Sequence, residues 1–161
     1  MSKSLLKLKK NDWKLLKSDV NERSITHKLA IYLQENFPNF DVDCEYNRGG
    51  LDPKILNLPV SNILDNATKA KTVFPDIIIH ERGTNNNILV IEVKKSSNRN
   101  SNGRTDEEKL YAYIQQLGYR FGLFIKLYVG EEYVKLPEIK YLRYKLDKKD
   151  WGKAINIFNK K

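Results

Sequence analysis

Two apolar segments on either side of a polar turn constrain the fold of this chain more than any other feature. Residues 73–80 and 88–95 are almost wholly apolar. Short apolar runs that are bounded by turn residues predict two buried strands, joined here as a hairpin. Charged residues nevertheless stand at one end of both strands: Asp76 in the first, and Glu92 and Lys94 in the second. Because buried charges are costly unless they are paired or bind a metal, this cluster is the candidate site.

The register of the hairpin decides whether the two carboxylates meet. If His80 pairs with Ile88, Asp76 lies opposite Glu92 on the same face. Opposed side chains in an antiparallel pair lie roughly 5 Å apart. Two carboxylates at that distance repel each other unless a cation lies between them, and a slip by one residue would separate them. Lys94 shares the face of Glu92, because side chains two residues apart on a strand point the same way.

This group suits a hard divalent cation. Carboxylate and carbonyl oxygens are the ligands that Mg²⁺ or Mn²⁺ takes, so Asp76, Glu92 and the backbone carbonyl of Val93 are the candidate metal ligands. Lys94 would position the attacking water or stabilise the charge that develops in phosphodiester hydrolysis. The alternative is an ordinary ion pair between Glu92 and Lys94 at the end of a strand.

The remaining pattern predicts alternating helices and strands around the hairpin. Residues 47–72, which contain glycines and prolines, indicate an irregular insertion, and residues 1–18 indicate either a short packed helix or a basic arm. Hydrophobic spacing, with a capping box at Thr105 and Glu108, predicts helices at 21–36, about 105–117 and 150–159, and strands at 40–46, 121–129 and 139–146.

Pro75-Asp76 followed by Glu92-Val93-Lys94 resembles the signature of the PD-(D/E)xK nuclease superfamily. The resemblance implies an α/β, restriction-endonuclease-like core: a central mixed β-sheet flanked by α-helices in the order αβββαβ. It spans about residues 21–129 of a single domain, 1–161, which ends in the strand and helix of 139–159. The activity implied is that of a Mg²⁺-dependent deoxyribonuclease, with Asp76, Glu92 and Lys94 as catalytic residues, in defence or DNA processing.

Three further positions match habits of this superfamily. Glu22 lies on the same helical stripe as Ile25 and Leu29, so its carboxylate is expected to point toward the sheet as a further catalytic residue and metal ligand. The alternative is a first-turn glutamate that complements the helix dipole. Gln115 and Tyr119, spaced one helical turn apart, are similar to a pair in the RecB-like branch and are candidate nucleic-acid contacts. The alternative is a polar helix residue and a boundary aromatic.

The charge balance favours a polyanionic partner. The formal net charge is +9, with 30% charged residues. Lys95, Arg99 and Arg104 follow the motif in a region rich in serine and asparagine, and Lys71 precedes the hairpin, so these four residues are candidate nucleic-acid contacts. A solvated loop is the alternative. Asp41, Asp43 and Glu45 are interpreted as a solvated strand face, and His80 as a residue that ends a strand.

Composition sets the remaining expectations. No segment approaches the 18 or so apolar residues that a membrane span needs. Cys44 is the single cysteine, which favours a reducing, cytoplasmic setting. Sequence-specific cutting by so small a chain would require the 47–72 insertion, a homodimer or a partner subunit. The alternatives to a deoxyribonuclease are a nuclease-like nucleic-acid-binding module without turnover and an RNA-processing nuclease.

Overall fold

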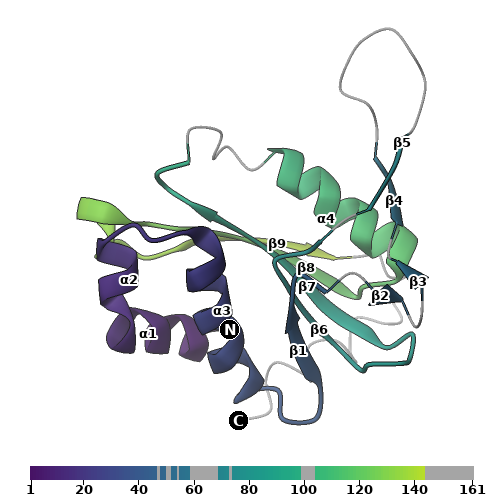
Figure 1. Cartoon of the computed structure of the whole chain (residues 1–161), viewed down its shortest axis with the longest axis horizontal. Coiled ribbons are helices and arrows are strands. Elements are labelled where there is room, and N and C mark those ends of the chain that lie inside the picture. The colour runs from purple at the N-terminus through teal and green to yellow at the C-terminus, as the bar shows by residue number, and fades with distance from the viewer. Residues whose placement is uncertain are drawn as a thin grey trace, which may run out of the picture.

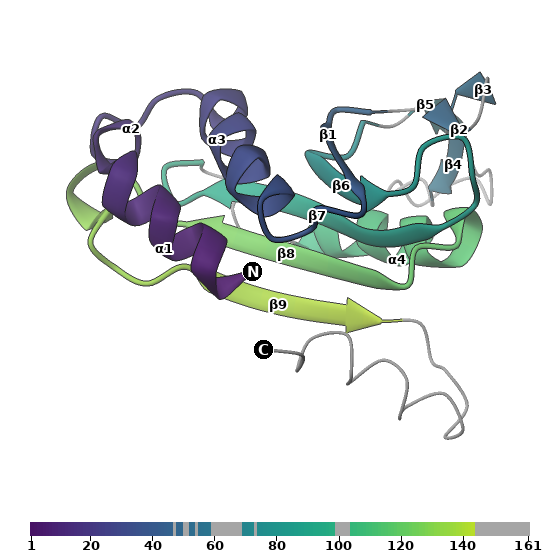
Figure 2. The same cartoon turned by 90° about the horizontal axis from the view of Figure 1, so that it is seen from below.

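The centre of the molecule is a mixed β-sheet. The computed structural model describes residues 1–46, 48–49, 52–53, 55–58, 69–72, 74–98 and 104–143. Within them, five strands lie in the order β1-β6-β7-β8-β9 (Figure 2), with bounds Asp41–Cys44, Ile77–His80, Asn87–Lys95, Phe121–Leu127 and Glu138–Arg143. β7 and β8 run parallel, and the other neighbours run antiparallel. This confirms the predicted mixed sheet flanked by helices.

Helices cover both faces of the sheet (Figure 1). α1 (Ser2–Asn11), α2 (Trp13–Lys17) and α3 (Glu22–Gln34) contribute to a buried cluster on one face, and α4 (Arg104–Leu117) contributes to a second cluster on the other. Successive strand residues point to opposite faces: Ile77 and Ile91 belong to the first cluster, and Ile78 and Val90 to the second. Burial on both faces explains why these strands are apolar throughout rather than alternating.

The N-terminal segment packs against the sheet. Leu5 and Leu8 of α1 and Leu16 of α2 are buried in the first cluster. The Ser4 hydroxyl donates a hydrogen bond to the Tyr32 carbonyl of α3 (3.1 Å). Of the two interpretations of residues 1–18, the packed helix is therefore correct, and the structure divides it into two helices.

α3 begins at a capping residue. The Asn21 side chain accepts a hydrogen bond from the backbone N–H of Ser24 (2.8 Å), which satisfies one of the free amides at the start of the helix. Ile25, Leu29 and Leu33 then bury one stripe of the helix against the sheet. The cap places Glu22 in the first turn of the helix.

The hairpin adopts the expected register except at its closed end. Ile77 pairs with Ile91 and Ile79 with Leu89, as the prediction requires. The predicted pairing of His80 with Ile88 is wrong: a shift between Ile79 and His80 places His80 opposite Asn87. A local irregularity of this kind is absorbed next to the turn and leaves the opposite end of the hairpin in register.

The insertion is more regular than predicted. Two short strand pairs form there, β2 with β3 (Arg48–Gly49, Asp52–Pro53) and β4 with β5 (Ile55–Leu58, Lys69–Thr72). Leu56 of β4 is buried in the cluster that α4 covers, so the insertion contributes to the core. The predicted strand at 139–146 corresponds to β9, and the predicted helix at 150–159 lies outside the described residues. In the described part of the chain, no helix has the length and apolar character to cross a membrane.

Candidate functional site

The candidate site lies where β7 extends past the start of its neighbour. β6 begins at Ile77, so the amides of Val93 and Lys95, farther along β7, have no partner on that side among the described strands. Carboxylates take that place: Asp76 Oδ2 accepts from the N–H of Val93 (2.7 Å), and Glu22 Oε2 accepts from the N–H of Lys95 (3.1 Å). Side-chain carboxylates thus accept the hydrogen bonds that a neighbouring strand would otherwise accept, and the pairing of β6 with β7 stops here. Asp76 and Glu22 therefore both reach the end of β7, and the carboxylate of Glu22 points toward the sheet, as predicted.

Glu92 is the most deeply buried carboxylate of this group, with 3% of its surface exposed. Its Oε1 is buried without a hydrogen-bond partner among the described residues. Burial, followed by the nearby charge of Asp76, raises the pKa of Glu92 to about 8. Burial also raises the pKa of Asp76 to about 6, against the hydrogen bond from Val93. The register of the hairpin beside Ile77 and the effect of the Asp76 charge on the pKa of Glu92 both agree with the predicted approach of the two carboxylates.

Two lysines lie near these carboxylates, Lys94 on β7 and Lys109 on α4. Lys94 Nζ lies 3.6 Å from Glu22 Oε1 and 3.9 Å from Asp106 Oδ1. Lys109 Nζ, from α4, lies 3.6 Å from Glu92 Oε2 and 3.1 Å from Asp106 Oδ1. Glu92 is therefore paired with Lys109. The ordinary strand-end pair of Glu92 with Lys94 is not among the ion pairs of the described residues.

Asp106 and Lys109 were missed by the sequence interpretation, although a signal for Asp106 was present. Asp106 stands four residues before Leu110 and seven before Tyr113, so it falls on the buried stripe of its helix. The same spacing argument had selected Glu22 on the preceding helix. Asp106 is itself buried, with 5% exposed. On both α3 and α4, an acidic residue on the apolar stripe of the helix is therefore the sequence pattern that indicates this site.

The donor set fits a hard cation in part. In the described part of the chain, no three His, Cys, Asp or Glu side chains form a ready-made metal cluster. Glu22 instead accepts hydrogen bonds from Lys95 and from the side chain of Asn98 (2.9 Å). Asp76 and the unpartnered oxygen of Glu92 remain as oxygen donors. The N–H and C=O of one strand residue point to the same side, so the Val93 carbonyl points to the edge where its N–H meets Asp76.

Lys95, a predicted nucleic-acid contact, is paired within the protein. Its ammonium donates to Asp19 Oδ1 (2.8 Å) and to the Val20 carbonyl (2.8 Å), and 12% of the side chain is exposed. These contacts tie the end of β7 to the turn between α2 and α3, and they leave little of the ammonium for a phosphate. Of the other predicted nucleic-acid contacts, Arg99 and the side chains of Arg104 and Lys71 lie outside the described residues.

The expectation that Gln115 and Tyr119 lie one helical turn apart is wrong. α4 ends at Leu117, and Gly118 follows with φ +68°, a left-handed conformation typical of the residue after a helix. Gln115 is exposed, whereas Tyr119 is buried edge-on against Tyr113 in the core. The structure therefore assigns Tyr119 to packing.

The acidic face of β1 is less solvated than predicted. Asp43 Oδ2 lies 2.9 Å from His80 Nε2, and its carboxylate also accepts hydrogen bonds from Arg82. Arg82 also contacts Asp41, and Glu45 accepts from Arg23 (2.6 Å). His80 does end its strand, as predicted, and is buried there. Asp41, Asp43, His80 and Arg82 are thus paired charges toward the turn end of the hairpin, whereas Glu45 lies next to Asp76.

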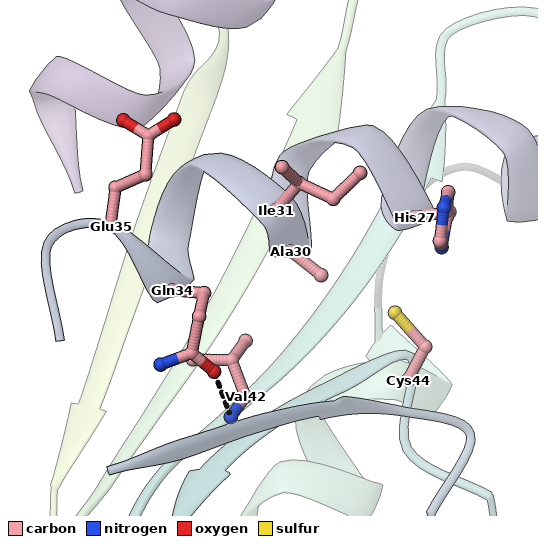
Figure 3. A pocket seen from close by; sticks show the side chains of 7 residues that line it. All are labelled: His27, Ala30, Ile31, Gln34, Glu35, Val42 and Cys44. Atoms are coloured by element: carbon pink, nitrogen blue, oxygen red, sulfur yellow. Dashed lines mark hydrogen bonds between the residues drawn. The ribbon is translucent and has the colours of Figure 1, made fainter. Parts of the chain in front are cut away.

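A hollow of about 470 Å³ lies between α3 and β1, at the outer edge of the sheet (Figure 3). Gln34 Oε1 accepts from the N–H of Val42 there (3.1 Å), which covers part of that edge. Burial raises the pKa of the Cys44 thiol to about 11, so it is a poor nucleophile. Glu35 points away from Cys44 and His27, so polar groups do not converge in this hollow as they do around Glu92.

No family model matches this chain, and no curated protein matches it either. Among solved structures, the crystal structure of SSO0001 has a TM-score of 0.40 and 16% sequence identity, and the match covers 97% of this chain and 71% of that chain. A likeness this weak carries no argument about family or activity. The function has to be argued from the site itself.

Proposed function

We propose that this protein is a metal-dependent nuclease that hydrolyses phosphodiester bonds in DNA on a restriction-endonuclease-like core. The observation that carries the proposal is Glu92: a carboxylate with 3% exposure and an oxygen without a partner in the described structure, beside a second carboxylate, Asp76. A site for binding nucleic acid alone gains nothing from two carboxylates that face a polyanion. A hydrolytic site needs them to hold a cation.

The metal would be held by Asp76, Glu92 and the carbonyl of Val93. When bound, Mg²⁺ supplies Lewis-acid activation of a phosphate oxygen and of water. Lys94 contributes a positive charge at the same end of β7, where it would stabilise the charge developing on phosphorus-bound oxygens. Glu22 lies 3.6 Å from the ammonium of Lys94 and bonds the amide of Lys95. Its role is therefore to position Lys94 rather than to bind the metal.

Cleavage of supercoiled, linear and single-stranded DNA with Mg²⁺, Mn²⁺ or EDTA tests the proposal. We expect Glu92→Gln and Lys94→Ala each to lower the cleavage rate by about 100-fold or more, the usual loss when a group that stabilises the transition state is removed. Glu132→Gln and Lys135→Ala are matched controls, because these residues form an exposed ion pair after β8. Both should cleave at the wild-type rate.

The same assay decides between this proposal and its rivals. Wild-type protein that binds DNA but cleaves no nucleic acid with any metal would be a binding module and would overturn the enzymatic proposal. Cleavage confined to RNA would instead identify an RNA-processing nuclease. Full activity of Glu92→Gln would show that the buried carboxylate is not the catalytic group.

A further inference from the structure

Lys109 lies beside the carboxylate proposed to bind the metal, where a metal site by itself needs no lysine. It comes from α4, on the face of the sheet that Glu92 shares, and its side chain is 30% exposed. Its Nζ lies 3.6 Å from Glu92 Oε2 and 3.1 Å from Asp106 Oδ1. One ammonium is thus within reach of two buried carboxylates at once.

The charge balance around Glu92 explains what Lys109 does there. An ionised carboxylate with 3% exposure requires a compensating positive charge. Lys109 supplies one at Oε2, whereas Oε1 has no hydrogen-bond partner among the described residues. A divalent cation at the same carboxylate would bring two positive charges to a place where one already stands. Lys109 and the metal would therefore repel each other.

We propose that Lys109 is a built-in competitor for the metal site: it neutralises the ionised form of Glu92 in the metal-free protein and withdraws from it when a divalent cation binds. This inference rests on the proposed function, since it assumes a metal at Glu92. The inference adds to the proposed function that Lys109 opposes metal binding and so controls how readily the site is loaded. Lys109 stabilises the empty site and weakens metal binding, so the ion concentration needed for loading is higher than the carboxylates alone would set.

Asp106 gives Lys109 a second partner. It precedes Lys109 by three residues on α4 and accepts a hydrogen bond from its ammonium. When Lys109 withdraws from Glu92, the ammonium keeps this partner. Removing the charge of Asp106 should therefore hold Lys109 more firmly on Glu92 and raise the cost of metal binding.

Calorimetric titration with Mg²⁺ in the absence of nucleic acid measures this competition. The titration is done at about pH 9, above the pKa of about 8 for Glu92, so that a proton is not the competing cation. We expect Lys109→Met to lower the Kd for Mg²⁺ by about tenfold or more, which corresponds to about 1.4 kcal/mol. Asp106→Asn should raise the Kd, and this effect should shrink when Lys109→Met is also present.

Thermal unfolding at the same pH of about 9, where Glu92 is ionised, gives a second readout that does not depend on activity. Lys109→Met should lower the Tm in EDTA, because Glu92 loses its cation, and Mg²⁺ should restore more of the Tm than it does in wild type. Lys140→Met is the matched control: Lys140 lies on β9, two strands from Glu92, and pairs with Glu107 of α4 rather than with Glu92. Its Mg²⁺ affinity should equal that of wild type.

The outcomes separate the two proposals. If wild type binds Mg²⁺ and Lys109→Met binds it no more tightly, with the Tm lowered equally in EDTA and in Mg²⁺, Lys109 is only a structural ion pair and this inference is wrong. If neither protein binds Mg²⁺ or Mn²⁺, the metal site of the proposed function is wrong. Lys109→Gln provides the same comparison if the methionine variant does not fold.

Discussion

Asp76 and Glu92 are both acidic and close together, but their surroundings differ. Asp76 accepts a hydrogen bond from a backbone amide, which partly offsets the cost of its burial. Glu92 is more deeply buried, and one of its oxygens has no partner in the described structure. Two neighbouring carboxylates whose surroundings push their pKa values apart are typical of functional sites rather than of scaffolds.

The raised pKa values of these two carboxylates determine how we expect the stability of the metal-free protein to depend on pH. Folding raises the pKa of Glu92 from 4.5 to about 8 and that of Asp76 from 3.8 to about 6. The folded state therefore binds more protons than the unfolded state in this range, and its free energy of unfolding should fall as pH rises from about 5 to about 8. Glu92→Gln should flatten this dependence. Urea unfolding in EDTA measures it, and an unchanged slope in the variant would contradict the assignment.

At the scale of elements, the site depends on where β6 and α3 begin and where β7 ends. β6 begins at Ile77, β7 continues to Lys95, and Glu22 in the first turn of α3 accepts a hydrogen bond from the amide of Lys95. Asn21 sets the start of α3 through its cap and so holds Glu22 beside Lys94. The helix start is therefore a structural element of the site as well as of the fold.

Removing the cap should affect both stability and the site. Asn21→Ala is expected to lower the free energy of unfolding by about 1 kcal/mol, because the amide of Ser24 loses its acceptor. Asn21→Asp keeps an acceptor and should remain close to wild type. Urea unfolding of the two variants provides the comparison. Equal stability of the alanine and aspartate variants would show that the hydrogen bond does not stabilise α3.

At the scale of the whole molecule, the insertion belongs to the core. Leu56 is fully buried with Ile78, Val90 and Tyr113 beneath α4, the helix that carries Asp106 and Lys109. The sequence predicted an irregular segment at 47–72, because the local pattern did not reveal a pairing partner for β4. β5, which begins eleven residues after β4 ends, pairs with it and makes it a strand. Pairing between distant segments is not readable from local spacing.

Leu56→Ala tests the role of the insertion in the core. We expect the free energy of unfolding to fall by about 2–5 kcal/mol, the usual cost of deleting buried methyl groups and leaving a cavity. Leu136→Ala is the control, since that side chain is 75% exposed and its loss should change stability by less than about 0.5 kcal/mol. Urea unfolding measures both variants. A Leu56→Ala protein as stable as the control would mean that the insertion does not support the core.

Local pattern was sufficient for the elements of the hairpin and for the carboxylates on it. Alternation and apolar runs predicted the strands, the register near Ile77 and the position of Glu22, because these depend on side-chain periodicity along one segment. Spacing alone related Gln115 to Tyr119 as residues one helical turn apart, although α4 ends at Leu117 and Tyr119 lies in the core. The glycine that follows Leu117 was the signal for that end.

The residues of the chain were enough to select Asp76, Glu92 and Lys94, since the cost of burying charge is a property of residue type and apolar context. Only the tertiary structure paired Glu92 with Lys109 and tied Lys95 to Asp19. The strength and role of a charge depend on which groups lie within a few ångströms of it. Those groups come from α4 and from the turn between α2 and α3, and folding alone brings them to β7.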